Sequence, residues 1–159
     1  MPVYRPSERR LVLRLMAYWD DMRGDSLLPV AADIDPEVLG DDWAHCYLLE
    51  ARYPAIHSEF KHIGSIFDPE MPEGGIDTML ECPHGTLLHA ATHYLDRVLQ
   101  KKVPISLGGA ASLGPDEVIY RSVLLPFSSD GETIDHVLGG ANYKVTIDDE
   151  DDNIGPEDE

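Results

Sequence analysis

The stretch DEVIYRSVLLPFSSDGETIDHVLGGANYKV, residues 116–145, contains two apolar segments separated by a short polar turn. Both segments are rich in β-branched and aromatic residues, which is typical of strands. The intervening SSDG places Gly131 where a hairpin turn requires a positive φ. PISLGGAASL, residues 104–113, precedes them and has the same character. The stretch therefore predicts three successive antiparallel strands.

Two further strands and a helix are expected upstream of this region. WAHCYLLEA (43–51) and EFKHIGSIF (59–67) are short apolar runs bounded by turn formers. In the second run Phe60, His62, Gly64 and Ile66 alternate with Lys61, Ile63 and Ser65. Residues 86–102 have helical periodicity and end before Pro104. Two strands, a crossover helix and three antiparallel strands give an α+β fold.

An amphipathic helix of about four turns is expected at the N-terminus. Ser7 is its expected N-cap, Gly24 ends it, and an apolar stripe repeats at three and four residues. Asp35 and Pro36 then have the arrangement that begins another helix. The expected organisation is residues 1–36 as helix and linker, residues 37–147 as the domain, and residues 148–159 as a disordered acidic tail. The stripe consists of Val12, Leu15, Met16, Trp19 and Met22.

Composition and charge restrict the function classes. The chain has 159 residues, enough for one domain with a hydrophobic core, and a formal net charge of −18. The last twelve residues hold eight of the thirty acidic side chains, which leaves 22 acidic against 12 basic residues elsewhere. A surface this negative repels phosphate backbones, so nucleic-acid binding is not expected. No apolar run is long enough to span a membrane and no secretory h-region is present, so the expected location is the cytoplasm.

The segment ECPHGTLLHAATHYL, residues 81–95, gathers Cys82, His84, His89 and His93. His89 and His93 lie four residues apart on one helical face, which is the geometry of two zinc ligands. That face also carries Asp96 and points away from the apolar stripe. The glutamate of HExxH is absent, as is any CxxC. We expect a solvated polar face, and metal binding by this cluster stays open as the alternative.

Other catalytic motifs are absent from the sequence. No GxSxG elbow surrounds a serine, and neither Cys46 nor Cys82 lies in a redox or nucleophile motif. LGGAASLG and LGGANYK lack the lysine of a phosphate loop and the spacing of a dinucleotide fingerprint. In strands such glycines mark bulges or close backbone approach. The expectation is a protein that is not an enzyme.

Three stretches carry a resemblance to a known family. YWDDMRGDSLLPVAADIDP (18–36), FKHIGS (60–65) and YRSVLLPFSSDGETIDHVLGG (120–140) resemble the small stand-alone bacterial PAS proteins. The resemblance covers residues 10–145. It implies a five-stranded antiparallel sheet with the 86–102 helix packed across it and a small cavity between them. The chain departs from the family between Gly64 and Thr86, the segment that contains Cys82 and His84.

The resemblance, with the strand pattern, indicates where a ligand would bind. PAS folds bind haem, flavin, small metabolites or nothing, so the fold names no cofactor. We expect an unidentified small molecule between the 86–102 helix and the sheet, with His62 as the candidate for a hydrogen bond to it. The expected cavity contacts are Phe60, His62, Ile66, Leu88, Ala91, Leu95, Tyr120 and Leu124.

The N-terminal helix is the expected partner surface. Leu11, Tyr18 and Trp19, with the helix arginines, have the composition of interaction hot spots, and a homodimer through this helix is one expectation. In the alternative, the helix folds back over its own sheet and buries Trp19.

Three function classes follow from these patterns. The first is a sensory or regulatory module that binds a ligand, a regulatory protein or both. The second is a metalloprotein that uses His84, His89 and His93, and the third is a structural adaptor without a ligand.

Overall fold

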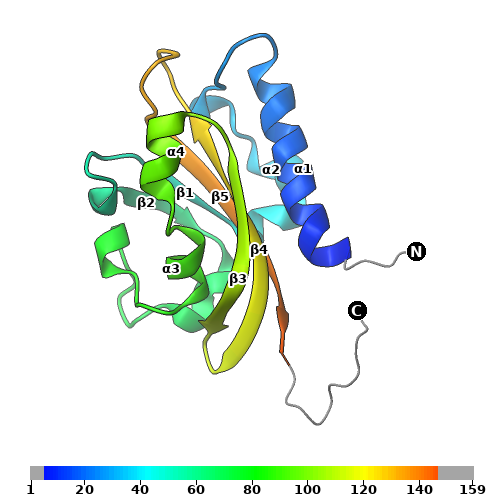
Figure 1. Cartoon of the computed structure of the whole chain (residues 1–159), viewed down its shortest axis with the longest axis vertical. Helices are drawn as coiled ribbons and strands as arrows, with labels where there is room; N and C mark the ends of the chain where they lie inside the picture. The colour runs from blue at the N-terminus through cyan, green and yellow to red at the C-terminus, as the bar shows by residue number, and fades with distance from the viewer. Residues whose placement is uncertain (1–5, 147–159) are drawn as a thin grey trace.

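The fold is an antiparallel sheet with helices on both faces (Figure 1). The computed structural model describes the backbone of residues 6–146 and the side chains of residues 10–146. Within this range five strands pair in the order β2-β1-β5-β4-β3, all antiparallel. They are β1 (Cys46–Glu50), β2 (Glu59–Ile63), β3 (Ile105–Leu113), β4 (Asp116–Phe127) and β5 (His136–Val145).

Helices cover the two faces of the sheet separately. α1 (Pro6–Arg23) packs on β4 and β5, whereas α3 (Leu87–Ala91) packs on β3 and α4 (Leu95–Lys101) on β4. Figure 1 shows α1 on one side of the sheet and α3 and α4 on the other. The short α2 (Pro36–Leu39) begins at Asp35, whose carboxylate accepts a hydrogen bond from the N–H of Glu37, as expected. The predicted α+β fold, with five strands, an N-terminal helix and a crossover, is confirmed.

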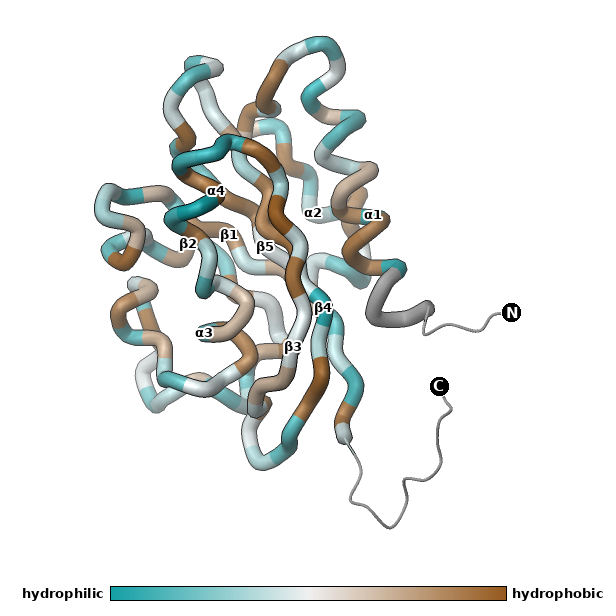
Figure 2. The backbone as a smooth tube through the Cα atoms, in the orientation of Figure 1, coloured by the Kyte–Doolittle hydropathy of each residue, from teal (hydrophilic) through white to brown (hydrophobic). Residues whose placement is uncertain are grey.

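α1 lies against its own sheet through the predicted apolar stripe. Leu15 is fully buried, and a Cβ on Gly140 of β5 would collide with its Cδ1 atom. The indole of Trp19 is buried and its Nε1 donates a 2.7 Å hydrogen bond to the carbonyl of Pro126 in β4. Figure 2 shows hydrophobic residues along α1, β1 and β5, and hydrophilic residues at the turn between β4 and β5. The predicted N-cap at Ser7 and the predicted disorder of residues 148–159 lie outside the described side chains.

The predicted helix over residues 86–102 is wrong in one respect, because it is interrupted. The N–H of His93 bonds to the carbonyl of Ala90, three residues back, and Tyr94 has φ −102° and ψ 26°. The hydroxyl of Thr92 donates to the carbonyls of Leu88 and His89 and competes for the acceptors that a continuous helix uses. The crossover is therefore two short helices, α3 and α4, that meet at Thr92–Tyr94.

Three predicted strands are shorter than expected, and one of them, β5, begins at His136 and not directly after the SSDG turn. Trp43–His45 belongs to a 3₁₀ segment, η2 (Gly40–His45), so β1 begins at Cys46. β2 ends at Ile63 because the chain turns at Gly64 into η4 (Ser65–Glu70). The remaining 3₁₀ segments are η1 (Ala31–Asp33), η3 (Ala55–His57) and η5 (Met79–Glu81). None of the helices in residues 6–146 is both long and apolar enough to cross a bilayer.

Candidate functional site

The inner face of the α3–α4 layer contains most of the expected cavity residues. Leu88, Ala91 and Leu95 are buried, and Tyr120 and Leu124 of β4 are buried in the same core. Tyr120 and Leu124 have the same parity along β4, so both point to the same sheet face. The structure therefore brings these five residues into one core.

The other three expected cavity residues, Phe60, His62 and Ile66, lie in β2 or just after it. A bulge in β2 places one extra residue between the pairs Leu49↔Phe60 and Leu48↔His62, so the alternation reverses after Phe60. Phe60 remains on the face of Leu49, but His62 shares the opposite face with Leu48. The prediction that His62 points into the cavity is therefore wrong. Its ring stacks on Trp43 with centroids 3.9 Å apart, and its Nε2 lies 3.1 Å from the carbonyl of Trp43.

Ile66 lies in η4 and is only half-buried, whereas its neighbour Phe67 is fully buried. The predicted alternation fails here because η4 is a 3₁₀ segment and not a strand. The ring of Phe67 meets that of Tyr47 edge-on, with centroids 5.7 Å apart. Phe67, and not Ile66, is the η4 side chain that reaches the centre of the core.

Two buried hydroxyls in this core have no hydrogen-bond partner among the described residues: Tyr47 Oη and Ser122 Oγ. Both residues are fully buried. Tyr47 of β1 pairs with Gly139 of β5, and Gly139 pairs on its other side with Leu124 of β4. Ser122 of β4 pairs with Ala141, which lies two residues after Gly139 in β5. Tyr47 and Ser122 therefore share the sheet face that α3 and α4 cover. The small residues Gly139 and Ala141 lie between them.

The surroundings of Tyr47 keep its phenol neutral. Phe60 and Phe67 meet its ring edge-on, and a Cβ on Gly139 would collide with the ring. Burial raises the pKa of Tyr47 well above its ordinary value, so the hydroxyl is protonated at any physiological pH. An unpartnered buried hydroxyl costs free energy, which a ligand with polar atoms would recover.

Sequence reasoning missed both hydroxyls, although a signal was present. Ser122 lies between Tyr120 and Leu124 at the same parity, so the alternation that selected those two residues also selects Ser122. Tyr47 has the same parity as Leu49 in β1 and therefore the same inward direction. Its position opposite Gly139 could be recognised only once the strand register was known.

A hollow lies at the surface between the α3–α4 break and the segments η3 and η5. It has a volume of about 390 Å³. Its polar side carries the predicted histidines: the rings of His84 and His89 are 4.5 Å apart, and those of His89 and His93 are 6.5 Å apart. The structure thus brings the three imidazoles together, as the alternative prediction requires. We call this hollow the histidine groove; its lining is Pro54, Ala55, Ile56, Met79, Leu80, Cys82, His84, His89, Thr92, His93, Leu95 and Asp96.

The arrangement does not support the metal alternative. Between Arg10 and Thr146 no group of three or more histidine, cysteine, aspartate or glutamate side chains is placed to hold a metal ion. Burial, followed by the proximity of Glu70, raises the pKa of Cys82 to about 12, so its sulfur is a protonated thiol in the free protein. Cys46 is equally unsuited to nucleophilic chemistry, because burial raises its pKa to about 12 as well.

The expected partner surface on α1 is only partly available. Leu11 and Trp19 are 1% and 7% exposed and lie in the chain's own core. Tyr18 is half-buried, and its hydroxyl accepts a hydrogen bond from the N–H of Asp35. The prediction that Leu11 and Trp19 face a partner is wrong, because the apolar stripe of α1 packs on the sheet of its own chain. The alternative, a helix folded back over its sheet, describes the structure.

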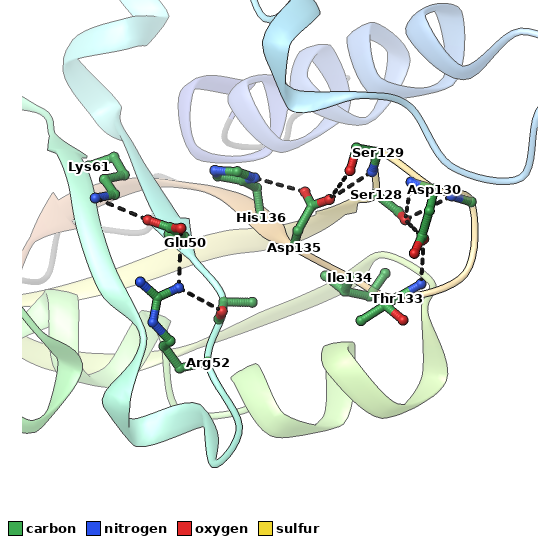
Figure 3. A network of polar contacts seen from close by, with 12 residues as sticks. Glu50, Arg52, Lys61, Ser128, Ser129, Asp130, Thr133, Ile134, Asp135 and His136 are labelled. Carbon is green, nitrogen blue, oxygen red and sulfur yellow. Dashed lines mark hydrogen bonds and ion pairs between the residues drawn. The ribbon is translucent and has the colours of Figure 1, made fainter.

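Polar contacts at the β1–β2 edge and at the β4–β5 turn are structural (Figure 3). Glu50 forms ion pairs with Lys61 and Arg52. In the turn the carboxylate of Asp130 accepts hydrogen bonds from the N–H groups of Thr133 and Glu132 and from the hydroxyl of Ser128. These bonds lower the pKa of Asp130 to about 2. They stabilise the hairpin predicted from SSDG.

The chain matches a known family over most of its length. The family model described as PAS domain matches residues 8–141, from α1 to within β5. No curated protein matches the chain.

Proposed function

Since the chain belongs to the PAS domain family, we propose that it is a sensory module that binds a small ligand between the sheet and helices α3 and α4. Members of this family serve in general as sensory and regulatory modules. The ligand state would then be read by a regulatory partner that contacts the domain surface. No catalytic step is part of this proposal.

The main support for this proposal is the pair of buried hydroxyls without a hydrogen-bond partner among the described residues, Tyr47 Oη and Ser122 Oγ. The other buried polar side chains already have hydrogen-bond partners within the described chain: Ser58, Glu70, Thr92 and Ser128. Tyr47 Oη and Ser122 Oγ each have donor and acceptor capacity that the described residues leave unused. Buried polar groups are nearly always hydrogen-bonded, so such a pair on one sheet face indicates an additional polar molecule. The ligand we propose therefore carries hydrogen-bonding atoms that contact both hydroxyls.

The position of the site suggests how binding would be transmitted. The ligand would lie beneath Leu88 and Ala91 of α3, just before the interruption at Thr92–Tyr94. Two short helices joined by an irregular segment can shift relative to each other more readily than one continuous helix. A ligand that binds one arrangement of α3 and α4 better than the other would shift their populations.

The test is mass spectrometry of protein purified without a metal-affinity tag, under native and then denaturing conditions. We expect an organic mass in the native spectrum that is lost on denaturation. The variant carrying Tyr47→Phe and Ser122→Ala should lack this mass. Tyr143→Phe, on the same sheet face but half-buried, is the matched control and should keep it.

Stability measurements extend the test. Without ligand, removing an unpaired buried hydroxyl leaves no orphaned partner, so the double variant should be as stable as the wild type or more stable. A bare chain mass in the wild type, combined with a loss of stability in the double variant, would show that water satisfies these hydroxyls and would overturn the proposal in favour of a structural adaptor. A retained zinc mass in place of an organic one would overturn it in favour of the metal alternative.

A further inference from the structure

The histidine groove is a concave site on the outer side of α3 and α4. Its walls come from η3, from η5 and from the α3–α4 break. His84 and His93 are exposed, whereas Leu88 and Ala91 of the same layer are fully buried toward the sheet. The groove is therefore distinct from the core site at Tyr47 and Ser122. Its volume of about 390 Å³ lies in the range of pockets that hold small molecules.

One end of the groove is apolar and open to solvent. Ile56 of η3 and Leu80 of η5 are 46% and 60% exposed, although both are large aliphatic residues. Met79 and Ala55 continue the apolar wall, and Leu95 lies at its base. Exposed aliphatic side chains on two contacting segments of a hollow are typical of a surface that an apolar chain covers.

The other end carries imidazole groups and no lysine or arginine. The Nδ1 atom of His89 lies 3.4 Å from the N–H of Gly85 and accepts from it. In the neutral ring the proton is then on Nε2, which leaves this atom as a hydrogen-bond donor. The ring nitrogens of His84 and His93 make no hydrogen bond to any side chain or backbone group between Arg10 and Thr146. Each neutral imidazole supplies one donor, so the cluster offers donors and no cationic side chain to an acceptor group.

The charged groups around the imidazoles limit the kind of acceptor. Asp96 of α4 is the one carboxylate in the described lining, and Cys82 at the base is a protonated thiol. Glu70 lies behind Cys82 and is occupied by the N–H groups of Leu87 and Leu88, while Glu81 of η5 turns back to the N–H of Thr78. With a chain charge of −18, a dianion such as phosphate would meet strong repulsion. A carboxylate carries a single charge.

We propose that the histidine groove binds a monocarboxylate with a short apolar chain, the carboxylate at His84, His89 and His93 and the chain against Ile56 and Leu80. The proposal goes beyond the core ligand site and does not depend on it. Burial, followed by the proximity of His84 and His93, lowers the pKa of His89, so this ring is neutral at pH 7 in the free groove. A bound carboxylate favours the charged imidazole, so binding takes up a proton and strengthens as the pH falls.

The experiment titrates the full chain with octanoate by calorimetry at pH 7.5 and pH 6.0. If binding of octanoate takes up one proton, its affinity should rise roughly tenfold for each unit by which the pH falls within the range of that protonation. The neutral alcohol 1-octanol is the ligand control and should bind more weakly, with no dependence on pH. Shifts of the histidine Cε1 protons in NMR spectra should locate the carboxylate.

Four variants test the two ends separately. His84→Gln with His93→Gln changes two exposed rings, so folding should be unaffected while octanoate affinity falls at least tenfold and its pH dependence shrinks. Leu80→Ser should lower affinity several-fold at both pH values. Asp96→Asn removes the opposing carboxylate and should raise affinity a few-fold. His57→Gln, an exposed histidine outside the groove lining, is the matched control and should change nothing.

Three results would overturn this proposal. The first is absence of octanoate binding at millimolar concentration at either pH. The second is equal binding of octanoate and 1-octanol, or unchanged binding in the double histidine variant. The third is loss of octanoate binding in the Tyr47→Phe and Ser122→Ala variant, which would place the compound in the core site and leave the proposed sensory function standing.

Discussion

Replacement of Trp19 by phenylalanine tests whether α1 belongs to the core of its own domain. The change removes the indole N–H that bonds to the carbonyl of Pro126 at 2.7 Å and leaves that buried acceptor unpaired. Such an orphaned acceptor costs about 1–3 kcal/mol. The smaller ring also leaves a void larger than a methyl group beside a fully buried sheet face, at a cost of about 1 kcal/mol. We expect the free energy of unfolding to fall by about 2–4 kcal/mol.

The assay is urea unfolding together with a thermal melt at several protein concentrations. For a domain of this size each kcal/mol lowers the Tm by roughly 3 °C, so a decrease of about 6–12 °C is expected, independent of concentration. Leu13→Ala on the exposed side of α1 is the matched control and should change stability little. The reasoning would be refuted if Trp19→Phe were as stable as the wild type, or if the Tm of the wild type rose with protein concentration. Either result would indicate that Trp19 lies in a partner interface.

Two further predictions concern the sheet and its hairpin. Gly139→Ala should destabilise the fold by more than about 2 kcal/mol because the new Cβ collides with the buried ring of Tyr47. Gly109→Ala is the control and should be tolerated, because its Cβ would meet Tyr120 at 3.4 Å or more. Equal urea midpoints for the two variants would contradict this account. Asp130→Asn should destabilise the β4–β5 turn at pH 7, because three hydrogen bonds to the carboxylate lower its pKa to about 2 in the folded state. The carboxylate therefore contributes stability above its ordinary pKa of 3.8, and this contribution is lost as the pH falls through about 2. The urea midpoints of the wild type and the variant should converge in this pH range. A difference between the two midpoints that persists at pH 2 would show that the charge of Asp130 is not the cause.

Periodicity predicted the strands of the C-terminal half most accurately. β4 runs from Asp116 to Phe127, the bounds that the sequence pattern indicates, and β3 differs by one residue. These strands are long, regular and bounded by turn formers, so local pattern and tertiary pairing agree. The stripe of α1 and the helix start at Asp35 were predictable for the same reason.

The candidate sites were predictable only in part. The apolar core contacts of α3, α4 and β4 followed from parity, and the three histidines were close enough in sequence to suggest a cluster. Ile66 and His62 were misplaced because a 3₁₀ segment and a bulge reverse the alternation, and neither leaves a clear mark in the residue types. One wall of the histidine groove comes from η3, which is distant in sequence from His93 and carries no motif.

The amino-acid sequence by itself determined the α+β order, the apolar stripe of α1 and the membership of a family of sensory domains, because these depend on local periodicity and short motifs. Only the tertiary structure decided that Trp19 bonds to Pro126, that Tyr47 lies over Gly139 and that Ser122 shares its face. Each of these contacts joins residues far apart in the chain, and strand register sets two of them. A shift of one residue would turn Tyr47 to the other face of the sheet. β1 and β5 are far apart in the chain, so no hairpin turn fixes the register between them.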